Sequence, residues 1–349
     1  MSKLEMNYQS IVKSGDIYRK NYIDGIEAYI TRKKNDGYAE RERFMPASAL
    51  PRRLEEFRSK YVQMIGLDRL VDEECPESGI TLIGEYEDCE IYRVVVYVTP
   101  EIPFSGILFK PLLLKTAPLI IAQHGGGGTP ELCSDMNGKN NYNGMVRRLL
   151  KRNVSVFAPQ LLLWNVSGRS ETAPKHDIPY NRKSIDTALK QLGTSITALE
   201  IKGIMKSISY LSGFDFIEKD NIGMTGISYG GYFTLYTMAA DKRIKAGYSN
   251  AAFNDRNKYN FSDWCYNNAS KTFHDAEVAA LCAPRKLYVS VGKQDEVLGY
   301  DTAVLEAERV GKFFEAFDCP ENFVFDLWDG GHTMRPTDEG IDFLLSAFE

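Results

Sequence analysis

Apolar residues change their spacing along the chain at about residue 80. Between residues 50 and 67, apolar side chains such as Phe57 and Tyr61 recur at intervals of three and four, which predicts an amphipathic helix. Farther along, short runs rich in β-branched and aromatic residues begin. The runs at 91–99 and 105–111 predict a pair of antiparallel strands.

Over the rest of the chain, short apolar runs alternate with longer amphipathic segments. The expected strands cover residues 117–123, 154–160, 221–226, 244–249, 286–292 and 322–328. The expected helices cover residues 142–151, 193–211, 229–240, 302–317 and 338–348. Strands that alternate with helices predict an α/β fold with a mostly parallel central sheet and helices on both faces.

Length and pattern together suggest how the chain is divided. A chain of 349 residues could form two domains, but one enlarged α/β domain fits equally well. We expect an N-terminal helical extension over residues 1–80 and a catalytic α/β domain over residues 81–349. Residues 161–192 follow no period, so we expect a loop insertion near the active site, because long loops are usually functional or disordered.

Composition excludes several classes of function. The formal net charge is −5, which argues against a surface for nucleic acid or anionic membrane. The six cysteines form no C-x-x-C pair and are expected to be reduced thiols. They are Cys75, Cys89, Cys133, Cys265, Cys282 and Cys319. The four histidines do not cluster with cysteines or carboxylates, so no metal site is predicted.

The N-terminal sequence and the hydropathy bear on location. The first ten residues carry no apolar core and no cleavage site of a signal peptide. No apolar stretch approaches the ~20 residues needed to span a bilayer. We therefore expect a cytoplasmic protein without a membrane partner.

The strongest chemical signal is the G-x-S-x-G pattern at residues 226–230. It lies between an expected strand and an expected helix, which is the context that a nucleophile elbow requires. Gly226 and Gly230 allow the tight turn, so that the hydroxyl of Ser228 stands clear of the sheet. The alternative is a glycine-rich turn with an incidental serine, and the strand-to-helix context favours the nucleophile.

A second glycine-rich loop, His124 to Gly128, directly follows the strand expected at 117–123. Glycines let backbone N–H groups approach a substrate oxygen. Gly125 or Gly126, together with the N–H of Tyr229, would complete an oxyanion hole. A phosphate-binding loop is the alternative, but neither the Lys-Ser/Thr pair nor the G-x-G-x-x-G pattern of such loops is present. His124 is expected to hold the loop rather than act as a base.

A serine nucleophile needs a general base and an acid that orients it. In this type of fold the chain order is serine, acid, histidine. His332 follows the last expected strand and fits that order, whereas His274 precedes the strand that should carry the acid. Asp295 lies just after the strand at 286–292 and is our predicted acid, with Glu296 as the alternative.

Several residues are expected to line the substrate cleft, since they lie in loops above the sheet. Trp164, Arg169 and Trp264 are the predicted substrate-binding residues, and the tryptophans could stack on a sugar ring. Packing of the insertion against the body is an equally open interpretation for them. Arg182, Tyr180 and the Tyr229 side chain are further candidates, and Arg182 could equally be a structural ion-pair partner. No motif implies a cofactor.

Taken together, these motifs resemble bacterial α/β hydrolases of the acetyl xylan esterase and dienelactone-hydrolase-like group. The resemblance covers the chain from about residue 50 to its end. The matching segments are HGGGG (124–128), the helix from Leu192 to Leu211, GISYGG (226–231), His274 to Arg285, GKQDE (292–296) and GGH (330–332). It implies Ser228, Asp295 and His332 as catalytic residues. Lys286 departs from the group, whose members often carry proline there.

The sequence therefore predicts a serine-dependent carboxylic ester hydrolase that removes short acyl groups, plausibly acetyl, from a carbohydrate or small-molecule ester. A serine peptidase of the prolyl oligopeptidase type is the first alternative. Its usual N-terminal β-propeller does not fit the first 110 residues, which are too few and too helical. A non-catalytic binding protein on a hydrolase scaffold is the second alternative. The same fold can carry many functions, so the candidate site decides between them.

Overall fold

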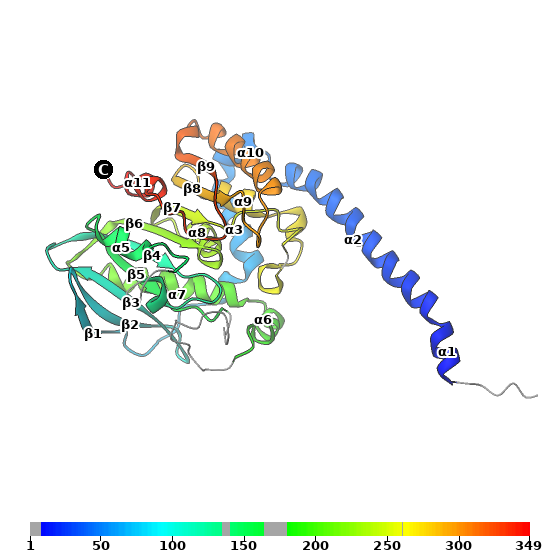
Figure 1. Ribbon diagram of the computed structural model, residues 1–349, viewed down its shortest axis with the longest axis horizontal. Coiled ribbons are helices and arrows are strands. Elements are labelled where there is room, and N and C mark those ends of the chain that lie inside the picture. The colour runs from blue at the N-terminus through cyan, green and yellow to red at the C-terminus, as the bar shows by residue number, and fades with distance from the viewer. Residues whose placement is uncertain (1–7, 135–139, 164–179, 260) are drawn as a thin grey trace, which may run out of the picture.

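A nine-stranded sheet forms the centre of the protein, and a long N-terminal helix extends away from it (Figure 1). The computed structural model describes residues 8–134, 140–163, 180–259 and 261–349. The strands are β1 (Gly79–Tyr86), β2 (Cys89–Thr99), β3 (Ile102–Pro111), β4 (Ala117–Gln123), β5 (Ser155–Pro159), β6 (Ile217–Ile227), β7 (Ile244–Asn250), β8 (Lys286–Gly292) and β9 (Phe323–Trp328).

The sheet is mixed, with its parallel part toward the C-terminus of the chain. The strand order is β1-β2-β3-β5-β4-β6-β7-β8-β9. The first three strands and the β3–β5 pair are antiparallel, which confirms the antiparallel pairing expected for 91–99 and 105–111. All later neighbours are parallel. The carboxyl ends of β4 to β9 therefore meet at one edge of the sheet.

Helices cover both faces of this sheet, as the sequence predicts. They are α1 (Tyr8–Ser14), α2 (Asp16–Phe44), α3 (Leu50–Ile65), α4 (Pro130–Cys133), α5 (Met145–Leu150), α6 (Arg182–Gln191), α7 (Ile196–Leu211), α8 (Tyr229–Ala240), α9 (Asp275–Ala280), α10 (Asp301–Ala316) and α11 (Glu339–Leu345). One buried apolar cluster joins α3, α7, α8, α9 and α10 to the sheet, and a second joins α4, α5 and α11. The strands β4, β5 and β8 are almost wholly buried, because both faces of the sheet are covered there.

Two segments differ from the sequence expectations. Residues 182–191, expected to be irregular, form α6, whose first turn is capped by the Asn181 side chain on the Ser184 N–H at 3.0 Å. Helix α2 lies within the N-terminal extension that was expected to be helical, but the sequence did not predict it as a single 29-residue element. The helix expected from residue 50 is confirmed as α3, and Phe57 and Tyr61 on it are fully buried.

Cysteine chemistry and membrane spans also follow from the structure. All six cysteines are free thiols, as predicted. Burial raises the pKa of the Cys282 thiol to about 11, so this thiol is a poor nucleophile at neutral pH. Within the described ranges, every helix is too short or too polar to cross a bilayer.

Candidate active site

The predicted site residues gather at the carboxyl edge of the parallel strands. The loop that starts at His124 follows β4, Ser228 follows β6, Asp295 follows β8 and His332 follows β9. Between β6 and β8 lies β7, which ends at Asn250. Open α/β sheets bind ligands outside this edge, so the fold brings together groups that are up to 208 residues apart in the sequence, from His124 to His332.

Ser228 occupies the sharp turn between β6 and α8. Its backbone lies at φ 58° and ψ −121°, a region that a residue with a Cβ rarely adopts. The flanking glycines make this turn possible. A Cβ on Gly226 would lie 2.6 Å from the Gln123 carbonyl oxygen, and one on Gly230 would overlap the same oxygen. The G-x-S-x-G spacing is thus required sterically, and the serine side chain stays partly exposed.

His332 and Asp295 form a direct pair at this edge. Nδ1 of His332 lies 2.8 Å from Oδ2 of Asp295. The other carboxylate oxygen of Asp295 accepts the N–H groups of Val297 and Leu298 at 2.8 and 2.9 Å. The Asp295 side chain is fully buried, while 20% of the His332 side chain is exposed. A carboxylate can only accept, so Nδ1 carries the proton and Nε2 is the basic nitrogen.

The alternative acids and bases lie elsewhere. Glu296 is exposed, and Asp329 forms a surface ion pair with Lys293 at 3.0 Å. His274 is buried rather than at the surface. It caps the N-terminus of α9, and its Nδ1 lies 3.4 Å from Oδ1 of Asp255. Of the predicted acids and bases, Asp295 and His332 are therefore the two that are in direct contact at the strand edge.

The glycine loop after β4 lies against Ser228. A Cβ on Gly125 would lie 3.4 Å from the Cβ of Ser228. The Gly125 N–H donates to the Tyr142 hydroxyl at 3.0 Å, so Tyr142 holds this amide. His124 is buried and bridges the loop, with Nδ1 2.9 Å from the Gly125 carbonyl oxygen and Nε2 accepting the Leu161 N–H at 3.1 Å. These contacts match the structural role expected for His124.

The remaining predicted oxyanion groups are Gly126 and Tyr229. Gly126 is buried in the same loop, and Tyr229 contributes the first backbone amide of α8. Amides in the first turn of a helix point along its axis and favour negative charge. The Tyr229 side chain turns into the body instead, where its hydroxyl donates to Oδ1 of Asp263 at 3.1 Å.

The residues expected to bind substrate fall into two groups. Trp164 and Arg169 lie outside the described residues. Trp264 lies beneath the elbow rather than on an open surface. It is 3% exposed, it stacks on Tyr232 at 4.9 Å between ring centroids, and the Arg256 guanidinium lies 4.2 Å from its ring. Its surroundings are those of a packing residue, so Trp264 does not enter the substrate site proposed below.

Arg182 is a buried ion-pair partner, which is one of the two roles that the sequence left open for it. Its guanidinium makes a two-pronged contact with Glu200 at 2.9 and 2.8 Å and donates to Asp263 at 2.7 Å. Burial raises the pKa of the Glu200 carboxyl, and the Arg182 charge opposes that rise. Since Asp263 also accepts the Tyr229 hydroxyl, this buried network fixes α6 and α7 against the elbow.

Asn250 is a site residue that sequence reasoning missed. Its carbonyl oxygen accepts the Ser228 N–H at 2.9 Å. Its side-chain amide donates to the Thr333 carbonyl oxygen at 2.7 Å and accepts the Arg335 N–H at 3.2 Å. One fully buried residue therefore ties the serine turn to the histidine loop. A polar residue at the carboxyl end of an apolar strand is the signal that could have marked it.

Replacing Asn250 with alanine is expected to lower kcat by about 10- to 100-fold, because an imperfectly placed histidine loses much of its catalytic effect. The carbonyl contact to Ser228 survives the change, so KM should move little. Hydrolysis of nitrophenyl acetate measures both constants. Asn221→Ala, in the middle of β6 and bonded to Glu218, is the control and should keep wild-type kinetics. An unchanged kcat in a folded Asn250→Ala variant would mean that the loop of His332 does not need the hydrogen bonds of the Asn250 side chain.

The described residues contain no group of three or more His, Cys, Asp or Glu side chains that could hold a metal ion.

Comparison with known proteins places this geometry in context. A model of the prolyl oligopeptidase family matches residues 196–278, the segment from α7 through the elbow to α9. A sequence search of curated proteins finds no match. Among solved structures, a methylesterase aligns with a TM-score of 0.67 at 17% identity, covering 91% of this chain and 68% of that one.

Two further solved structures belong to carbohydrate esterases. A glucuronoyl esterase from Solibacter usitatus aligns with a TM-score of 0.61 at 14% identity over 86% of this chain and 93% of its own. Acetyl xylan esterase 1 from Thermoanaerobacterium sp. aligns with a TM-score of 0.56 at 15% identity over 85% and 94%. The fold is that of the α/β hydrolases, and the match to the prolyl oligopeptidase family covers the part of it from α7 to α9.

Proposed function

We propose that this protein hydrolyses carboxylic esters through Ser228, with His332 as general base and Asp295 as the acid that orients it. The observation that carries the proposal is the His332–Asp295 pair at 2.8 Å. It stands at the strand edge where the turn of Ser228 leaves β6. A buried carboxylate whose second oxygen is held by two backbone amides is suited to fixing the ring and stabilising the imidazolium.

The proposed reaction has two halves. Oγ of Ser228 attacks the ester carbonyl while Nε2 of His332 takes its proton. The oxyanion of the tetrahedral intermediate accepts hydrogen bonds from the N–H groups of Gly126 and Tyr229, which are fixed before the charge develops. Collapse of the intermediate releases the alcohol, which receives the proton from His332. A water activated by the same histidine then releases the acid and restores Ser228.

The preferred substrate is a short acyl ester, such as an acetyl group on a sugar. The similarity in fold to an acetyl xylan esterase and two other esterases supports an ester over an amide. A peptidase of the prolyl oligopeptidase type is the second candidate, because that family model matches residues 196–278. The described residues before β4 build helices and three strands of the same sheet, so they do not supply the β-propeller usual in that group.

A substrate panel separates these candidates. We expect hydrolysis of nitrophenyl acetate and acetylated xylo-oligosaccharides, and no release from peptide nitroanilides. In an acetylated sugar, the sugar supplies the alcohol of the ester. A methyl ester of a uronic acid tests the opposite case, in which the sugar supplies the acid and methanol is the alcohol. Cleavage of the nitroanilides with no action on the acetylated sugars would favour the peptidase. Heat-inactivated protein and free nitrophenol standards control for spontaneous hydrolysis.

A further inference from the structure

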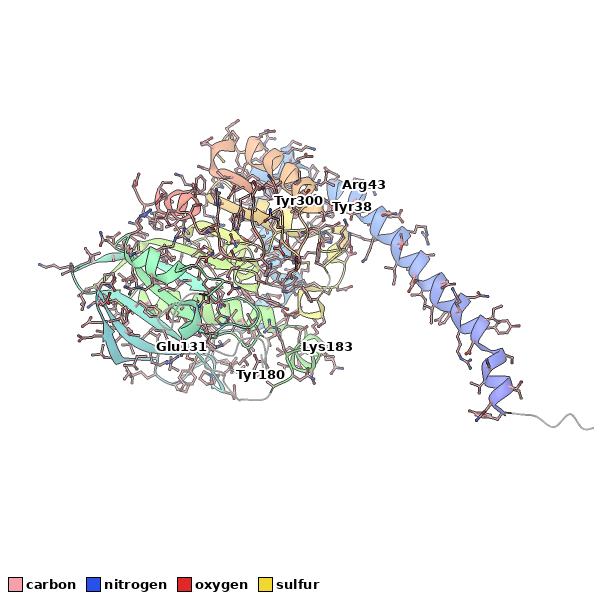
Figure 2. All side chains as sticks on the ribbon, viewed as in Figure 1. Tyr38, Arg43, Glu131, Tyr180, Lys183 and Tyr300 are labelled. Carbon is pink, nitrogen blue, oxygen red and sulfur yellow. The ribbon has the colours of Figure 1, made fainter. Side chains whose placement is uncertain are left out.

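The N-terminal arm, defined here as residues 8–33 of α1 and α2, projects from the body into solvent (Figure 1). Every residue from Tyr8 to Arg32 is exposed except Gly15, which is partly buried. The body is reached only at the end of α2. Figure 2 shows Tyr38 and Arg43 at that junction, and the side chains of the arm projecting on all sides of the helix.

The end of α2 is firmly anchored. Arg41 is 2% exposed and makes ion pairs with Glu277 and Glu306, both at 2.6 Å. Gly37 lies so close to the body that a Cβ there would be 2.5 Å from the Ser270 carbonyl oxygen. The Tyr38 hydroxyl donates to Asp255. Because the anchor is rigid, the helix holds the arm at a fixed angle to the body.

The arm carries an apolar stripe along one side. Residues three or four apart lie on the same side of a helix, and nine large exposed side chains follow that spacing. The stripe consists of Tyr8, Ile11, Val12, Tyr18, Tyr22, Ile23, Ile26, Tyr29 and Ile30, which are 39–79% exposed. Arg19 interrupts it, but its guanidinium turns back to Asp16 and to the Val12 carbonyl oxygen. Isolated helices are marginal in water, so this stripe calls for a partner.

We propose that the stripe pairs with the same stripe of a second copy of this chain, antiparallel and centred near Ile23. Covering the stripe would remove on the order of 700 Å² of surface per chain, close to the ~800 Å² per partner of a stable interface. The same surface is used on both copies, so the two-fold assembly closes on itself. In this antiparallel dimer, the two bodies lie at opposite ends of the helix pair and do not contact each other.

Charge along the arm favours the antiparallel direction. Arg19 and Lys20 form a basic turn, and Asp24 and Glu27 form an acidic turn, on either side of Ile23. Within one arm, these exposed side chains already pair, Lys20 with Asp24 at 2.5 Å and Arg19 with Asp16 at 2.8 Å, so that Glu27 is the charge most in need of a basic partner. An antiparallel pair centred there brings the acidic turn of each copy beside the basic turn of the other. A parallel pair in register would instead place the flank that carries Lys20 and Glu27 against the opposite flank of the partner, so that Glu27 would not meet Lys20.

Sedimentation equilibrium of the full chain tests the proposal. We expect a dimer at micromolar concentration, and a self-association at least 100-fold weaker for the double variant Ile23→Glu/Ile26→Glu. Ile17→Glu is the matched control, because Ile17 is 63% exposed but lies nine residues before Ile26, about two and a half turns away and thus on the opposite side. This variant should remain a dimer. Retained ester hydrolysis reports that the body of each variant is folded.

A charge exchange tests the direction of the pairing. Glu27→Lys alone is expected to weaken the dimer, and Lys20→Glu combined with Glu27→Lys to restore it. A wild-type chain that stays monomeric over this concentration range would overturn the proposal, and so would equal disruption by Ile17→Glu. Binding of a monomeric chain to lipid vesicles through the stripe would overturn it as well. Failure of the double exchange to restore the dimer would overturn the antiparallel arrangement.

Discussion

Replacing Ser228 with alanine is expected to lower kcat for nitrophenyl acetate by about 10⁴- to 10⁶-fold, the range seen when a catalytic serine is removed. The proposed reaction begins with attack by the hydroxyl of Ser228, and alanine removes only that oxygen. Alanine keeps the Cβ, so the strained backbone at φ 58° is neither relieved nor worsened. Folding should therefore be preserved, and circular dichroism with thermal unfolding checks it.

A second serine controls for the substitution itself. Ser209 lies on the exposed side of α7, where its hydroxyl donates to the Met205 carbonyl oxygen at 3.0 Å and accepts from the Arg243 guanidinium at 2.7 Å. Ser209→Ala should keep the wild-type rate. If Ser228→Ala also kept it, hydrolysis would occur elsewhere on the molecule. If the wild type itself showed no turnover on any ester or amide, the non-catalytic binding protein would become the better interpretation.

Replacing Asp295 with asparagine is expected to lower kcat by about 10⁴-fold, because the amide cannot hold the Nδ1–H tautomer of His332. The carboxylate accepts from Nδ1 at 2.8 Å, and it is fully buried. Asparagine has nearly the same shape, so the loop from Gly292 to Leu298 should stay folded. Hydrolysis of nitrophenyl acetate at several pH values measures the loss and separates it from a shift of the pH optimum.

Glu296 offers a matched control for this prediction, since it is the neighbouring carboxylate and is exposed. Glu296→Gln should leave kcat and KM unchanged. The opposite outcome, with Glu296→Gln inactive and Asp295→Asn active, would assign the acid to Glu296 and require the loop to rearrange on substrate binding. Loss of both activities would indicate that the loop as a whole, rather than one carboxylate, supports His332.

The buried network around Arg182 explains why the elbow can hold its strained turn. Arg182 binds Glu200 on α7 and Asp263, and Asp263 in turn accepts the Tyr229 hydroxyl. Leaving one partner of a buried ion pair uncompensated typically costs about 3–5 kcal/mol. The position of α8, and with it the first amide after Ser228, therefore depends on contacts made by residues far from the reacting atoms.

The sequence by itself determined the features that depend on local chemistry. Strand and helix periods need only neighbouring residues, so the parallel strands and the helices α5, α7, α8, α10 and α11 were predicted close to their observed bounds, whereas the helices α4, α6 and α9 were not predicted. The elbow was equally readable, because the collisions that Gly226 and Gly230 avoid involve a turn whose geometry is set by the motif itself. The chain order of Ser228, Asp295 and His332 also follows from the sequence alone.

Tertiary structure decided everything that depends on contacts between distant residues. Asp295 and Glu296 are adjacent in the sequence, and only the fold buries one against His332 and leaves the other in water. Asn250 contacts both the serine turn and the histidine loop because β7, which it ends, lies between β6 and β8. For Trp264 the sequence left open whether it lines a cleft or packs the body, and packing against Tyr232 and Arg256 buries it. The burial of a side chain and its choice of partner depend on contacts with residues far away in the sequence. A local sequence pattern therefore cannot show which of two similar side chains becomes buried and paired.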